Sequence, residues 1–311
     1  MLKRKVLKRL MILLCCLLIV GIIYIFPSTT DTEEDVDFIK QEDQDIIYLI
    51  DNNDYVARVN IVLNNEETLK KAKEIIEYLT INGKYNDYIR EGFSPIIPKN
   101  TKLLDISLSE GILKINFSKE FLNVNEKDEY KLLESIIYSL TELKNIKSIT
   151  LFVEGKILDK LPNSKINLPT TLDRNFGINK IYNLETINNT TKTTIYYISK
   201  YNDYYYYVPV TKVDNKSNEK IEIIIKELTS SSMLETNLMS YLASSVELLD
   251  YSQTENSLVL NFNNQILSDV HNNELLEEVV YSINLSIKDN YNIENVMYLA
   301  EDNIINTYIL S

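Results

Sequence analysis

The sequence predicts an α+β fold in which two tandem domains stand behind an amino-terminal transmembrane helix. Three observations carry this prediction: an apolar run that follows a basic cluster, an internal repeat, and the same order of strand and helix patterns in both copies of that repeat. The chain has 311 residues, a length that favours about two domains. Hydrophobic residues make up 45% of it, an ordinary value for a globular protein.

Residues 1–30 are predicted to be a basic cytoplasmic tail and a transmembrane anchor. Five basic residues come first: Lys3, Arg4, Lys5, Lys8 and Arg9. The run from Leu10 to Phe26 carries no charge and reaches the lower limit of about 17 residues for a spanning helix. Since Lys and Arg mark the cytoplasmic side, we expect a single-pass protein of the cell membrane, with its amino terminus cytoplasmic and its folded domains extracytoplasmic. A cleaved signal peptide is the alternative, but Phe26-Pro27-Ser28-Thr29 makes a poor cleavage site.

Residues 31–45 are predicted to be an acidic linker, because Asp31–Asp45 carries eight acidic residues and one Lys. The whole chain has a net charge of −13. An acidic surface argues against nucleic acid as a partner. One His and two Cys are too few for the usual zinc sites, so no metal and no cofactor are expected.

An internal repeat defines the two domains. Leu103-Leu104-Asp105-Ile106-Ser107 recurs as Leu248-Leu249-Asp250-Tyr251-Ser252. At the same offset Glu110, Leu113, Asn116, Phe117 and Leu122 match Glu255, Leu258, Asn261, Phe262 and Leu267. After a small shift Tyr138-Ser139 is paired with Tyr281-Ser282. We therefore expect domain 1 over residues 46–155 and domain 2 over 194–311. Residues 156–193 are expected to be a linker, most of which connects the two domains without folding. Copies of this length are tandem globular domains rather than a solenoid.

Each copy shows the element order ββαββαβ. In copy 1, strands are expected at 46–49, 56–63, 103–108, 112–117 and 148–154, and helices at 66–79 and 128–143. Ser109-Glu110-Gly111 forms a turn in which Gly111 can take a positive φ. In copy 2, strands are expected at 194–198, 204–213, 247–252, 257–262 and 294–300, and helices at 217–228 and 273–287, with a final edge strand at 303–310. One sheet with two helices on one face would bury both apolar helix stripes.

Five segments of copy 1 carry a family pattern: Gly92-Phe93, the stretch from Ile97 to Leu104, Gly111 to Phe121, Ser139-Leu140-Thr141-Glu142 and Val153-Glu154-Gly155. Together they give the chain a resemblance to the GerM domain family of sporulation and spore germination proteins. It implies domains similar to the ring-building motifs of secretion systems, no catalytic residues, and a role in supporting a channel-like assembly between mother cell and forespore. Family members are commonly lipoproteins, whereas here Leu14 precedes Cys15, where a lipobox would place a small residue. Copy 2 also departs from the pattern, with Ser230-Ser231-Ser232 in place of the long loop and Asn256 where Gly111 stands.

The function expected from these features is that of a non-catalytic, membrane-anchored scaffold in the cell envelope. Its partners would be envelope or sporulation-complex proteins, with the membrane contacted through the anchor. The alternative is a module that binds cell-wall glycan through exposed tyrosines, which would make peptidoglycan a partner.

Two segments supply candidate partner contacts. The loop from Asn82 to Thr101 is long for a compact domain, and Phe93, Ile96 and Ile97 in it would dock either onto their own domain or onto a partner. In the run from Tyr204 to Tyr207, strand alternation sends Tyr204 and Tyr206 to one face and Tyr205 and Tyr207 to the other. One of these faces would pack on helices, and the other would expose an aromatic pair.

The remaining polar candidates are expected to have structural roles and no chemical one. His271 is expected to be exposed or to cap the start of a helix. Asp105 and Asp250 recur in strands, and Glu110 and Glu255 recur in turns. Duplicated acids of this kind more often reflect common ancestry than a paired-carboxylate site, so no enzymatic activity is expected.

Overall fold

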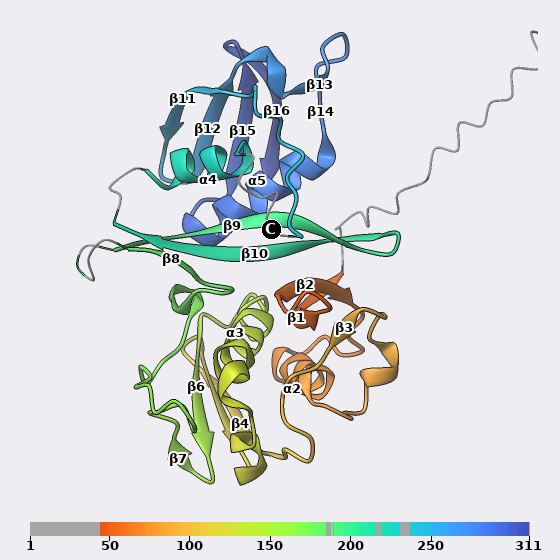
Figure 1. Cartoon of the computed structure of the whole chain (residues 1–311), viewed down its shortest axis with the longest axis vertical. Helices are drawn as coiled ribbons and strands as arrows, with labels where there is room; N and C mark the ends of the chain where they lie inside the picture. Colours follow the sequence, from red (N-terminus) through yellow and green to blue (C-terminus); the bar gives the residue numbers. More distant parts are fainter. Residues whose placement is uncertain (1–43, 185–187, 189, 216–218, 231–236, 311) are drawn as a thin grey trace, which may run out of the picture. The chain divides into compact units, whose positions relative to one another are not determined.

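The structure, a computed structural model, describes residues 44–184, 188, 190–215, 219–230 and 237–310. They belong to one compact unit, Gln41–Ser311, shown in Figure 1. The predicted anchor and most of the acidic linker lie outside the described residues. Within the described residues, no helix has the length and apolar character needed to cross a membrane.

Both repeats follow the predicted order of elements. Repeat 1 consists of β1 (Asp45–Asp51), β2 (Val56–Ile61), α2 (Thr68–Leu79), β3 (Phe93–Ser94), β4 (Leu103–Ser109), β5 (Ile112–Phe117), α3 (Glu129–Leu140), β6 (Ser148–Val153) and β7 (Lys156–Ile157). The segment after it contains the 3₁₀ turn η4 (Arg174–Phe176) and β8 (Ile181–Asn183). Repeat 2 consists of β9 (Thr191–Tyr201), β10 (Tyr204–Asp214), α4 (Lys220–Leu228), β11 (Leu248–Gln253), β12 (Ser257–Phe262), β13 (Leu267–Asp269), β14 (Glu274–Leu275), α5 (Glu277–Asn290), β15 (Asn295–Ala300) and β16 (Asn303–Ile309).

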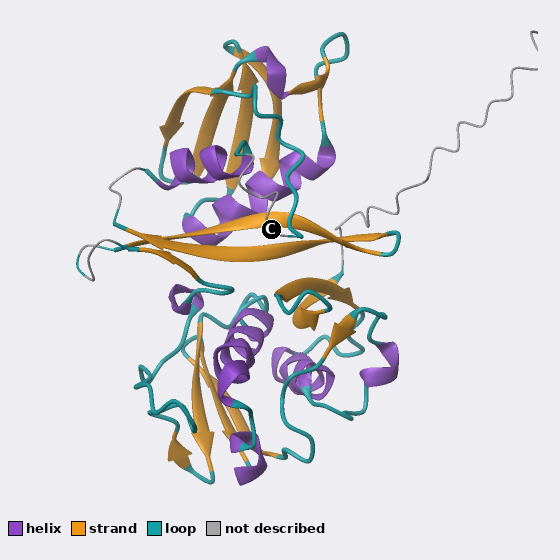
Figure 2. Cartoon of the chain, in the orientation of Figure 1, coloured by secondary structure: helices purple, strands orange, loops and turns teal. Residues whose placement is uncertain are grey.

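The strands of one repeat do not form the single sheet that the element order predicts. β4-β5-β6-β7 form one sheet, β11-β12-β15-β16 form another, and β1-β2 and β9-β10 lie elsewhere. The physical reason lies in the helices. Ten of the twelve residues of α3 are buried, so this helix needs cover on both sides, and it packs against β1 and β2 as well as β6. Figure 2 shows the equivalent layering in repeat 2, where α4 and α5 lie between the β11–β16 sheet and the β9–β10 hairpin.

The two repeats share a six-stranded sheet. Its order is β3-β1-β2-β10-β8, and β9 pairs with the other edge of β10. The junction is the antiparallel contact between β2 and β10, where Tyr207 faces Arg58. The repeats are therefore joined through a sheet and not only through a covalent linker.

Each outer sheet is built around a parallel crossover. β5 pairs with β6 and β12 pairs with β15 in parallel, connected through α3 and α5 respectively. The turn between β4 and β5 has Glu110 at φ 53° and Gly111 at φ 80°, which confirms the positive φ predicted for Gly111. In repeat 2, residues 267–275 form the β13–β14 hairpin, so α5 begins at Glu277 rather than near residue 273.

The segment 156–193, expected mostly to join the repeats, contributes to the core. Leu161, Leu172 and Ile178 are buried. The backbone of Leu172 exchanges hydrogen bonds with Ile149 of β6, both 2.8 Å long. β8 then pairs in parallel with the end of β10. The segment thus runs from the outer sheet of repeat 1 to the shared sheet.

Candidate functional site

The long loop of repeat 1 docks onto its own domain. Phe93 pairs with Asp51 in the short β1–β3 ladder. The N–H groups of Ile96 and Ile97 both donate to the carbonyl of Leu79 at the end of α2, at 3.0 and 2.8 Å. Phe93, Ile96 and Ile97 are all buried. This is the first of the two alternatives left open for the loop, and it leaves these three side chains little surface for a partner.

The loop also meets the tyrosine strand of repeat 2. The ring of Phe93 packs edge-on against Tyr206, with centroids 4.8 Å apart, and lies 6.0 Å from Tyr204. The hydroxyl of Tyr206 donates to a carboxylate oxygen of Asp51 at 2.8 Å. Two candidate segments that are far apart in the sequence therefore form one contact between the repeats.

Gly92 and Arg90 complete this contact. Gly92 has φ 91°, and a Cβ there would lie 2.6 Å from the ring of Tyr201. The guanidinium of Arg90 lies over the ring of Tyr204, 4.0 Å from its centroid. Only glycine fits the positive φ together with this close approach, so the loop is shaped for the β9–β10 hairpin.

Tyr205 and Tyr207 project from the opposite face of β10, as strand alternation predicts. Both are partly buried. Burial raises the pKa of Tyr241 to about 12, and the hydrogen bond that Tyr241 forms with Tyr205 acts in the same direction. The ring of Tyr207 lies 6.3 Å from Tyr281 of α5, and its hydroxyl is buried without a hydrogen-bond partner among the described residues. These tyrosines pack against other residues of repeat 2 and do not form an open aromatic surface.

A second contact between the repeats is a buried ionic cluster around Arg174 of η4, which the sequence did not single out. The guanidinium bridges Glu142, after α3, at 2.9 Å and Asp289, in α5. The hydroxyl of Tyr48 donates to Glu142 and that of Tyr196 donates to Asp289, both at 2.8 Å. The two hydroxyl oxygens lie 3.0 Å apart. Arg174 therefore forms an ion pair with one carboxylate from each repeat.

The charges in this cluster determine the ionisation of Glu142. Its burial by itself disfavours the charged form. Arg174, and after it Arg58 and Lys288, outweigh that penalty and lower the pKa of Glu142 to about 2. The carboxylate is therefore ionised at any physiological pH, so it forms an ion pair with Arg174 and does not act as an acid or base.

The cluster reveals the true correspondence between the repeats. The N–H of Tyr48 donates to the hydroxyl of Ser139 at 2.8 Å, and the N–H of Tyr196 donates to that of Ser286 at 2.9 Å. Ser139 is thus equivalent to Ser286, which corrects the pairing of Tyr138-Ser139 with Tyr281-Ser282. The usable signal was a serine followed three residues later by an acid, Ser139-Glu142 and Ser286-Asp289. Arg174 has no such duplicate to reveal it.

The remaining polar candidates lie apart on the surface. Asp105 and Asp250 are exposed on β4 and β11, and Glu110 and Glu255 are exposed in the following turns. His271 is exposed in the β13–β14 hairpin, where its N–H donates to Asp269. Across the described part of the chain, no group of three or more His, Cys, Asp or Glu residues could hold a metal ion.

Comparison with known proteins gives matches over both repeats. The sequence model of the family described as "Germane: Sporulation and spore germination" matches residues 46–159 and 194–303. Spore germination protein GerM of Bacillus subtilis (strain 168) is 31% identical over 260 residues, which cover 80% of this chain and 69% of that protein. The solved structure of the tandem GerMN domains of sporulation protein GerM from Bacillus subtilis superposes with a TM-score of 0.75 at 27% identity, covering 84% of this chain and 92% of that one.

Proposed function

Because this chain belongs to the Germane family of sporulation and spore germination proteins, we propose that it is a non-catalytic scaffold of the cell envelope that supports a multiprotein assembly during sporulation or germination. The observation that carries the proposal is the likeness to GerM over both repeats and over the fold that joins them. A role in sporulation or germination follows from the family. The scaffold role is the finer part of the proposal.

The way in which the repeats are joined supports a scaffold. The shared sheet, the Phe93 contact and the Arg174 cluster couple the two repeats at three places. Coupling at three places would limit the movement of one repeat against the other, which suits a protein that positions others. Asp105, Asp250, Glu110 and Glu255, by contrast, are exposed on strands and turns and form no enclosed pair of carboxylates for hydrolysis.

The proposal includes a location. Residues 1–30 would anchor the chain in the cell membrane with the amino terminus in the cytoplasm, and the folded unit would act outside it. Envelope or sporulation-complex proteins would be the partners. No metal, cofactor or nucleic acid is required.

A crosslinking pull-down of the full-length protein from sporulating and from growing cells tests this function. We expect defined envelope proteins to be recovered from sporulating cells. Recovery of the same background from both cultures would contradict the scaffold role. Retention on purified cell wall that added envelope proteins do not displace would instead favour the glycan-binding alternative, which the partial burial of Tyr205 and Tyr207 disfavours.

A further inference from the structure

The open edge of β16 has the features of a docking site for an extended peptide. β16 ends the β11-β12-β15-β16 sheet, and within the described residues it pairs with β15 alone. It is seven residues long, and Ile304 and Ile309 are 67% and 78% exposed. The corresponding edge strand in repeat 1, β7, has two residues. A long exposed edge is a template for a further strand.

The hydrogen-bond pattern identifies the groups that face outward. The N–H of Leu310 donates to the carbonyl of Glu294 at 2.7 Å, so position 310 points toward β15. Alternation along the strand then turns the backbone groups of Thr307 and Ile309 away from the sheet. In agreement, the N–H of Thr307 is bonded by the side-chain oxygen of Asn306 at 2.8 Å. A local side chain thus occupies a donor that an added strand would use.

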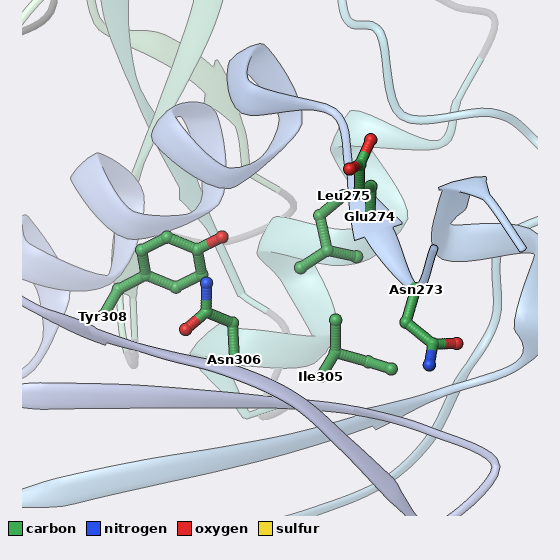
Figure 3. A pocket seen from close by; sticks show the side chains of 6 residues that line it. All are labelled: Asn273, Glu274, Leu275, Ile305, Asn306 and Tyr308. Carbon is green, nitrogen blue, oxygen red and sulfur yellow. The ribbon is translucent and has the colours of Figure 1, made fainter. Parts of the chain in front are cut away.

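A cleft lies beside this edge. It has a volume of about 210 Å³ and is lined by Asn273, Glu274 and Leu275 of the β13–β14 hairpin and by Ile305, Asn306 and Tyr308 of β16 (Figure 3). Its exposed lining is mainly polar, with Glu274 and the amides of Asn273 and Asn306 among the lining groups. An added strand would place alternate side chains toward this cleft.

The charge around the edge specifies the occupant. Between Thr229 and Ser311 the chain carries twelve Asp or Glu residues and one Lys. This single lysine, Lys288, lies 3.7 Å from Glu142 of repeat 1. Exposed acids surround β16: Glu274, Glu277, Glu294, Glu301 and Asp302. Within the described residues none of these five forms an ion pair with Lys or Arg.

We propose that β16 binds an extended, basic segment of a partner protein as an additional antiparallel or parallel strand, with Lys or Arg side chains meeting the surrounding acids and the polar cleft. This inference rests on the proposed scaffold function and names the chemistry of its partner. A second copy of this chain is a poorer occupant, because its own repeat 2 would bring the same negative charge to the edge.

A peptide-binding experiment tests the proposal on the full chain in detergent micelles. The probe is a fluorescein-labelled peptide of alternating Lys and Val, matched to the seven residues of β16. One control peptide carries Glu in place of each Lys, and a second carries N-methyl groups on alternate amides. We expect saturable binding of the first peptide by fluorescence polarisation, weakened when salt is raised well above 0.1 M, where charges are screened beyond about 10 Å. Neither control peptide should bind.

Three variants locate the site. Thr307→Pro removes an outward N–H that makes no ladder bond, at an edge position where proline is tolerated, so the sheet should persist while affinity falls about tenfold or more. Thr307→Val keeps that N–H and should bind as the wild type does. Asn306→Ala frees the N–H of Thr307 and should tighten binding by about two- to tenfold.

The proposal is overturned if no binding occurs, if the Glu peptide binds equally well, or if Thr307→Pro binds as tightly as Thr307→Val while both show native circular dichroism. A concentration-dependent increase in size, abolished by Thr307→Pro, would reassign the edge to self-association and would also overturn it. The crosslinking pull-down separates this inference from the function beneath it. If Thr307→Pro still recovers the envelope proteins, the scaffold function stands and the β16 site falls.

Discussion

Replacing Arg174 with Met tests whether the buried cluster holds the two repeats together. Met keeps much of the side chain's length but leaves the carboxylates of Glu142 and Asp289 without their shared cation. Those side chains are 13% and 3% exposed, so little water reaches them. Removing one partner of a buried ion pair costs about 3–5 kcal/mol. For a unit of this size, that lowers the melting temperature by roughly 6–20 °C.

The assay is thermal unfolding of the full chain in detergent, followed by circular dichroism. A triple variant, Arg174→Met with Glu142→Gln and Asp289→Asn, removes the stranded charges and should recover most of the loss. A melting temperature for Arg174→Met within about 2 °C of the wild type would refute the reasoning, because it would correspond to 1 kcal/mol or less.

The same cluster determines the response to acid. The pKa of Glu142 falls from an ordinary 4.5 to about 2 on folding, so its contribution is present above pH 4.5 and is lost as pH falls toward 2. The size of that contribution is about 3 kcal/mol. In the Arg174→Met protein the pKa of Glu142 rises, and acid unfolding should begin at a higher pH than in the wild type. The free energy of unfolding of both proteins is measured by urea titration at several pH values. If it falls with decreasing pH in the same way in the wild type and in Arg174→Met, this assignment is contradicted.

Three further substitutions test the contact between the loop and the tyrosine strand. Phe93→Ala should cost about 3–5 kcal/mol in urea unfolding, because the ring is buried against Tyr206, whereas a partner-facing side chain would leave stability unchanged. Gly92→Ala should lower stability more than Gly155→Ala: both positions have positive φ, but a Cβ meets the Tyr201 ring at the first and nothing within 4 Å at the second. Tyr207→Phe should be neutral or stabilising, whereas Tyr206→Phe should cost about 1.5–3 kcal/mol with the loss of its bond to Asp51; equal effects would contradict the assigned partners.

Local patterns predicted the elements well because each element carries its own signal. The alternation in β5 and β12 places both strands at their observed bounds, the apolar period of α3 places that helix within three residues, and Gly111 fixes the turn between β4 and β5. The hairpin β13–β14 was not predicted, since its two strands have three and two residues and no alternation to detect.

The arrangement of the sheets could not be read from those patterns. Whether β1 and β2 extend the β4–β6 sheet or cover the other side of α3 depends on contacts between the repeats. No local sequence pattern indicates such a contact, for example the pairing of Tyr207 with Arg58. The role of Arg174 could not be predicted for the same reason. A single arginine in a segment with Pro162 and Pro169 is typical of an exposed linker residue. The sequence predicts that Phe93, Ile96 and Ile97 dock either onto their own domain or onto a partner, because periodicity does not show whether an apolar loop side chain points inward or outward.

The measurement that tests the scaffold role most directly is site-specific photocrosslinking in living cells, with the photoreactive residue placed in turn at Ile309 on β16 and at Leu104 on β4, which are both exposed positions of outer-sheet edges. We predict that sporulating cells yield discrete protein adducts from the Ile309 position that growing cells lack. Adducts from the Leu104 position would show that repeat 1 also contacts partner proteins. Adducts to cell-wall glycan alone, or no adduct from either position during sporulation, would contradict the claim that this chain is a protein scaffold of the envelope.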